Sequence, residues 1–190
     1  MALTDIGLCS RALVQIGAHP ITSFTDDTAQ SEIAALLYAP VRDSLLSAYA
    51  WSFATGQVNI LPLASTPLAD YPYAYELPLD CLRVISAGAT GSGSGLPSRL
   101  YRGTLQCAAP EGITLTYIFR TDEASFPPYF DMALITRLAA EFCLPLTENT
   151  ARATFLAGAA EKEFARARQI DAQQDSPNRI TRFSLIDARE

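Results

Sequence analysis

The fold is decided by residues 33–54, IAALLYAPVRDSLLSAYAWSFA. Apolar side chains recur there at spacings of three and four, as they do on a helix with one buried face. This spacing leaves Arg42 and Asp43 toward solvent. We therefore predict a long core helix over residues 29–54, whose apolar face carries Ile33, Leu36, Leu37, Val41, Leu45, Ala48 and Tyr49.

Two features modify this helix. Pro40 lies inside the periodic run, so we expect a kink, or two helices with Pro40 in the first turn of the second. At the end of the run Trp51, the only tryptophan, stands close to Phe53 and precedes Thr55-Gly56 and an alternating segment. We expect the aromatic pair to hold a helix-to-strand junction.

The composition limits both the size and the partners of the protein. A chain of 190 residues with 49% apolar and 18% charged residues can bury one main core, with at most a smaller satellite. The low charged fraction suggests that neighbours cover part of the surface. A net charge of −6 argues against sequence-independent binding to nucleic acid, which relies on Lys and Arg at phosphates. An acidic wall around DNA remains compatible with this charge, because repulsion prevents adhesion.

We expect no secretion and no membrane span. The amino-terminal residues lack the basic start and apolar core of a signal peptide, and no later run approaches the length that crosses a bilayer. The four cysteines are scattered without a Cys-x-x-Cys pair, so we interpret them as small buried hydrophobes. These observations predict a protein made in the cytoplasm.

Periodicity divides the chain into helical and β segments. Residues 4–16, 127–143 and 148–172 have helical patterns, whereas residues 56–120 contain six short segments of β-forming residues bounded by Pro and Gly. We predict a mainly α protein: a bundle of about four helices from residues 1–55 and 125–173, with a small antiparallel β subdomain inserted at 56–124. An extended C-terminal segment follows at 174–190.

A search for catalytic chemistry finds only weak candidates. The glycine-rich stretch 88–95 lacks the Gly-Lys-Ser/Thr ending of a P-loop, so we predict a flexible exposed loop. Glu76 and Asp80 could divide acid and base work, but they flank a proline turn near Arg83, which favours turn capping and a surface ion pair. We predict no enzyme, no cofactor and no metal site.

The C-terminal segment contains more apolar residues than solvent exposure requires. Its apolar residues alternate with arginines, so we expect it either to bind a partner or to fray. The candidate partner-binding residues are Arg179, Ile180, Arg182, Phe183, Leu185 and Ile186.

Several short motifs occur in the order found in one known family. They are YAWSFA (49–54), YELPLDCLRV (75–84), FDMAL (130–134), LAAE (138–141) and LPLT (144–147). In this order the chain, over residues 1 to about 172, resembles the head-to-tail adaptors, or tail tubular proteins, of tailed bacteriophages. It is most similar to the adaptors of alphaproteobacterial gene transfer agents. The structural motif residues are Trp51, Phe53, Glu76, Pro78, Asp80 and Arg83.

The resemblance implies a structural role in a phage-like particle. Such adaptors form a homo-oligomeric ring, commonly of twelve copies, beneath the portal protein, where they extend the DNA channel and dock stopper or tail proteins. DNA passes without sequence-specific binding. We expect this chain to move from the host cytoplasm to the neck of the particle, with its C-terminal segment binding the portal. The alternatives are a small hydrolase or nucleotide-binding protein using residues 88–95 with Glu76 and Asp80, or a monomeric regulatory binding module.

Overall fold

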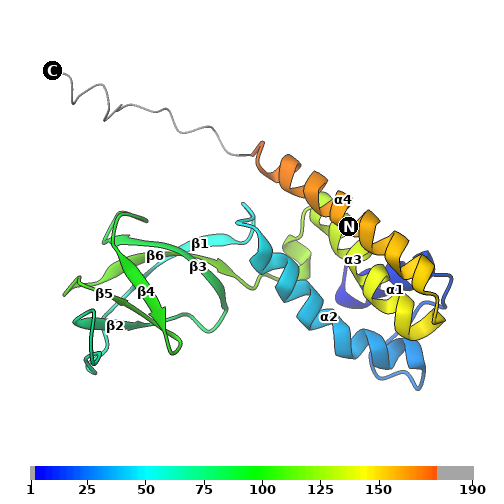
Figure 1. Cartoon of the computed structure of the whole chain (residues 1–190), viewed down its shortest axis with the longest axis horizontal. Coiled ribbons are helices and arrows are strands. Elements are labelled where there is room, and N and C mark those ends of the chain that lie inside the picture. Colours follow the sequence, from blue (N-terminus) through cyan, green and yellow to red (C-terminus); the bar gives the residue numbers. More distant parts are fainter. Residues whose placement is uncertain (1–2, 175–190) are drawn as a thin grey trace.

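The computed structural model describes residues 3–174, which form four α-helices, a short 3₁₀ helix and six strands (Figure 1). In chain order the elements are α1 (Asp5–Gln15), α2 (Ala29–Ala48), β1 (Thr55–Ile60), β2 (Tyr73–Glu76), β3 (Cys81–Ala89), β4 (Ser98–Tyr101), β5 (Thr104–Cys107), β6 (Ile113–Phe119), η1 (Glu123–Ser125), α3 (Pro128–Thr147) and α4 (Thr150–Asp171). We call α1–α4 the helical region and β1–β6 the β region.

The prediction of a mainly α protein with a small β insertion is wrong. Of the described residues 44% are helical and 20% lie in strands, which form two separate three-stranded antiparallel sheets. The chain is therefore an α+β protein. The six strands were located from their β-forming residues, but such local patterns do not reveal which strands pair. The division into two sheets with a core between them was therefore not predicted.

Helices α1, α2 and α4 begin at side-chain caps, and α2 ends where the backbone becomes extended. The hydroxyl of Thr28 accepts a hydrogen bond from the Ser31 N–H at 3.2 Å, which satisfies a free donor at the start of α2. Pro40 lies inside α2 without dividing it into two helices. The helix ends at Ala48 rather than at residue 54, because Tyr49 is extended (φ −141°, ψ 154°). Residues 49–54 thus connect α2 to β1.

α3 is the central helix and packs against α1, α2 and α4. The helix predicted from the pattern of residues 127–143 is confirmed, and Phe130, Leu134, Leu138 and Phe142, spaced four residues apart, are all fully buried on one of its faces. The helix continues through Pro145 to Thr147, past the predicted end at Cys143, since a proline in the last turn removes only one backbone hydrogen bond. A single large core therefore surrounds α3.

The β region has a second, smaller core. One sheet has the order β1-β6-β3 and the other β2-β5-β4. Tyr75, Leu105 and Leu115 are almost completely buried in this core. The Tyr75 hydroxyl lies 2.6 Å from the carbonyl oxygen of Ala109 and 2.8 Å from that of Glu111, so it ties β2 to the segment before β6.

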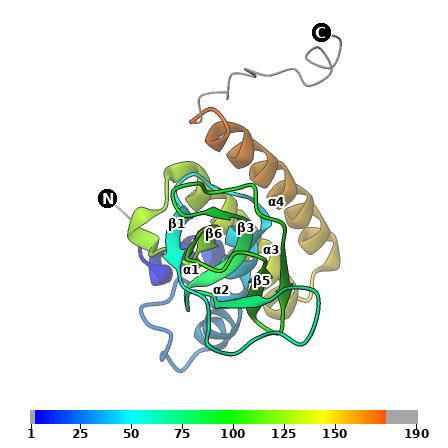
Figure 2. The same ribbon diagram turned by 90° about the vertical axis from the view of Figure 1, so that its left-hand side faces the viewer.

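The β region lies at one end of the helical region (Figure 1). Two connections join the regions: residues 49–54 from α2 to β1, and residues 120–127 from β6 to α3. Viewed from the β end, the strands lie in front of α1 and α2, and α4 lies at the edge of the molecule (Figure 2).

Candidate functional site

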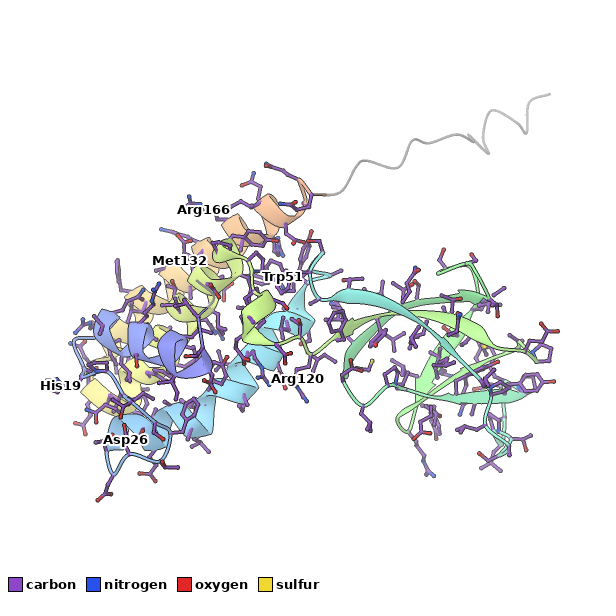
Figure 3. The ribbon with its side chains drawn as sticks, turned by 180° about the vertical axis from the view of Figure 1, so that it is seen from behind. His19, Asp26, Trp51, Arg120, Met132 and Arg166 are labelled. Atoms are coloured by element: carbon purple, nitrogen blue, oxygen red, sulfur yellow. The ribbon has the colours of Figure 1, made fainter. Side chains whose placement is uncertain are left out.

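The first connection is built around Trp51, which is fully buried at the end of α2 (Figure 3). Its indole N–H donates to the carbonyl oxygen of Leu45 at 3.0 Å, which satisfies one of the free carbonyls near the end of α2. The ring makes edge contacts with Phe130 of α3 and Phe164 of α4, with centroids 5.1 and 5.8 Å away. Trp51 thus joins three helices beside the start of β1.

The carboxylate of Asp171, the last residue of α4, lies buried beside Trp51. It accepts hydrogen bonds from the Ser52 backbone N–H at 3.0 Å, from the Ser52 hydroxyl at 2.7 Å and from the Tyr129 hydroxyl at 2.7 Å. Burial is the larger cause and this bond to Asp171 the next, and together they raise the pKa of Tyr129 to about 12. These bonds fix the C-terminal end of α4 to the junction.

The second connection is held by a chain of alternating charges. Arg120 lies 2.7 Å from Asp43, Asp43 lies 3.0 Å from Arg42, and Arg42 lies 3.0 Å from Glu123. Arg42 and Asp43 were predicted to face solvent, yet their side chains are only 15% and 24% exposed. The network therefore binds α2 to the segment that leads from β6 into α3.

Burial and hydrogen bonding act in opposite directions on Glu123. Burial raises its pKa, but the hydrogen bonds from Tyr38 at 2.8 Å and from Arg42 outweigh this effect, so the pKa lies below its ordinary value. Burial and the bond to Glu123 raise the pKa of Tyr38. The carboxylate and the neutral phenol are thus the forms that this contact stabilises.

The predicted motif around Pro78 forms a turn between β2 and β3. The Cys81 N–H donates to the Pro78 carbonyl at 3.0 Å, and the Arg120 N–H donates to the Asp80 carbonyl at 2.8 Å. Glu76 and Asp80 are both exposed. Among the described residues no hydrogen bond or ion pair joins Glu76, Asp80 or Arg83 to one another, so this turn connects the two sheets without forming a carboxylate pair.

The glycine-rich segment 88–95 folds back against the sheet. The Gly93 carbonyl accepts hydrogen bonds from Ser86 at 2.7 Å and from Thr116 at 2.9 Å, and the Gly91 N–H donates to Thr114 at 3.0 Å. A Cβ at Gly88 would lie 1.7 Å from the Ser92 carbonyl oxygen, so only glycine fits there. The backbone N–H groups of Gly91 and Ser92 already donate hydrogen bonds to Thr114 and to the Ala89 carbonyl, so they are not available to bind a phosphate.

The structure separates the sequence-predicted residues into two groups. Trp51 and Phe53 meet at the junction, with ring centroids 5.9 Å apart. Pro78 and Asp80 lie in the turn between β2 and β3, which Glu76 precedes at the end of β2 and Arg83 follows in β3. The candidate partner-binding residues Arg179, Ile180, Arg182, Phe183, Leu185 and Ile186 lie outside the described residues.

Sequence reasoning missed Asp171 and the charge network. The Ser52–Asp171 contact joins residues 119 positions apart, and no local pattern in the sequence marks such a contact. The alternating signs of Arg42 and Asp43 were the only available signal for the network.

Within residues 3–174 no group of three or more His, Cys, Asp or Glu side chains is placed to hold a metal ion. No helix in this part of the chain is long and apolar enough to cross a membrane. Neither a protein-family model nor a curated protein matches the chain.

Proposed function

We propose that this protein is the head-to-tail connector, or adaptor, of a phage-like particle. It forms a ring, commonly of twelve copies, under the portal protein, where it extends the DNA channel and presents a docking surface to stopper or tail proteins. Its role is structural rather than catalytic. It acts in the neck of the particle after assembly from the host cytoplasm.

The observation that carries this proposal is that residues from the family-like motifs pack into one core, the core around α3. Trp51 of the first motif contacts Phe130 of the third, and Leu82 of the second packs against the same core. The LAAE motif adds Leu138 and Ala139 to that core. Because segments so far apart in sequence share one packing unit, their common order supports a shared fold rather than a set of chance matches.

The charge balance also supports a channel protein. A formal charge of −6 disfavours adhesion to phosphates, and a wall through which DNA must slide needs this property. The C-terminal segment, residues 174–190, supplies apolar and arginine residues for the portal in this proposal. In a ring, many weak contacts act together, so each copy needs to contribute little.

Loss of the protein from the particle tests the proposal. In particles assembled without it, we expect electron microscopy to find heads separated from tails, and complementation with the full chain should restore joined particles. Normally tailed, functional particles in its absence would contradict a connector role.

A deletion of residues 174–190 tests the portal contact specifically. Far-ultraviolet circular dichroism should be retained, because the cores lie within the described residues, while attachment to the portal should be lost. Undiminished attachment would exclude this segment as the portal-binding element.

A further inference from the structure

Residues of α2, α3 and α4 line a groove on the surface of the helical region. It has a volume of about 300 Å³. Its walls are partly apolar, and its residues come from all three helices: Pro40, Val41, Ser44, Leu45, Ala48, Arg137, Glu141, Ala160, Glu161 and Phe164. The groove is therefore a surface hollow that can receive an apolar side chain.

The charges in this groove are unbalanced. Arg137 pairs with Glu141 and with Glu161, in each case at 3.1 Å. One guanidinium thus serves two carboxylates, and the groove keeps one excess negative charge. A cationic side chain that entered beside an apolar group would neutralise this excess charge.

The opposite side of α4 carries an exposed aromatic ring and two cationic side chains, which complement the partly apolar, acidic groove. Phe155 is 75% exposed and precedes the groove residue Phe164 by nine residues, or two and a half helical turns, so the two rings lie on opposite faces of α4. Lys162 and Arg166 follow Phe155 by about two and about three turns and share its face. Figure 3 places Arg166 at the outer edge of the helical region.

We propose that this outer face of α4 in one copy docks into the α2–α4 groove of the next copy. Phe155 enters the apolar part of the groove, and Lys162 meets the carboxylates of Glu141 and Glu161. This inference rests on the proposed function, because it supplies the subunit contact that a connector ring requires.

A second copy fits this groove because the chain itself carries both complementary surfaces. They lie on opposite sides of α4, so one copy can use both at once. Such a heterologous contact joins copies in one direction and closes into a ring when the rotation between them permits. A two-fold symmetric dimer cannot use this contact, because Phe155 and the groove would then have to lie in the same interface, and they lie on opposite sides of α4.

Carbodiimide crosslinking of the full chain, alone at high concentration, tests the contact directly. Lys162 is the only lysine, so few amines can react. In dimers we expect peptides that link Lys162 to Glu141 or Glu161, and an equal mixture of ¹⁵N-labelled and unlabelled chain separates these from links within one copy. Absence of dimers, or Lys162 linked only to other carboxylates, would overturn the inference.

Two complementary variants provide a second test. Phe155→Glu removes the apolar side chain that docks, and Ser44→Trp fills the groove, so each should reduce dimer yield about tenfold. Their mixture retains one intact contact and should stop at a dimer, twice the 20.5 kDa chain mass. Leu36 of α2 lies outside the groove and is 71% exposed, close to the 75% of Phe155. Leu36→Glu is therefore the matched control for Phe155→Glu and should behave as wild type.

The contact would be contradicted if the Phe155→Glu variant alone assembled as well as wild type. It would also be contradicted if the mixture of Phe155→Glu and Ser44→Trp chains stayed monomeric. The outcomes also separate this inference from the proposed function. Rings on the portal without links from Lys162 to Glu141 or Glu161 would support the connector but overturn the contact. Those links without any portal ring would support the contact and contradict the connector.

Discussion

The helical region and the β region are stabilised in different ways. Around α3, large apolar side chains such as Trp51, Phe130 and Phe142 are fully buried in one core. In the β region the only fully buried aromatic ring is that of Tyr75, and this ring also holds two backbone carbonyls through its hydroxyl. The helical region should therefore be most sensitive to lost volume, and the β region to lost hydrogen bonds.

The largest expected effect is that of Trp51→Ala. It removes the side chain that joins three helices, and large-to-small substitutions of buried aromatic residues lower the free energy of unfolding by about 3–5 kcal/mol. Urea denaturation followed by circular dichroism measures this loss. Tyr101→Ala, at a half-exposed position on β4, should change it by less than about 0.5 kcal/mol. A similar small change for Trp51→Ala would contradict the packing described for the junction.

The next effect in size is expected at Asp171. Asp171→Asn places an amide N–H₂ group where a buried carboxylate accepts bonds from Ser52 and Tyr129, and we expect a loss of about 1.5–3 kcal/mol. The same denaturation experiment measures it. Glu163→Gln on the same helix is the control, since its ion pair with Arg166 is long, at 3.9 Å. Equal stability of the two variants would show that Asp171 does not hold α4 to the junction.

Tyr75→Phe tests the hydrogen-bonded character of the β region. The ring stays, but the carbonyls of Ala109 and Glu111 lose their partner, so we expect a loss of about 1–2 kcal/mol. Denaturant titration monitored by amide hydrogen exchange in β2 and β6 should locate this loss. Unchanged exchange there would argue against a structural role for the hydroxyl.

The smallest effect concerns the pH dependence conferred by Glu123. Its native pKa lies below the ordinary 4.5, so its contribution to stability is present above about pH 4.5 and is lost as the pH falls through the native value. Glu123→Gln should therefore lose less stability than wild type between about pH 5 and about pH 3. Thermal unfolding at a series of pH values measures this difference. Parallel curves for the two proteins would remove Glu123 from the acid response.

Local patterns predicted much of the backbone and little of the long-range pairing. The apolar period of α3 and the β-forming residues of β6 place these elements correctly, because both patterns follow from burial of one face. The pairing of β2 with β5 and of β6 with β1 and β3 depends on contacts between distant segments, so the two-sheet arrangement was not predicted.

The junction shows the same limit for the candidate site. Trp51 and Phe53 could be recognised because they stand together at the end of a periodic run. Asp171 could not, because an acidic residue in the last turn of a helix ordinarily faces solvent, and its partners Ser52 and Tyr129 come from distant segments. Arg42 and Asp43 were predicted to be exposed because helical spacing does not reveal that the chain returns past them at Arg120 and Glu123.

The most direct test of the connector proposal is the mass of the purified chain, alone and mixed with the portal protein of its particle. Light scattering and negative-stain imaging of the mixture should find a ring of this chain seated on the portal. A monomer that persists in the mixture without portal binding would contradict the proposal.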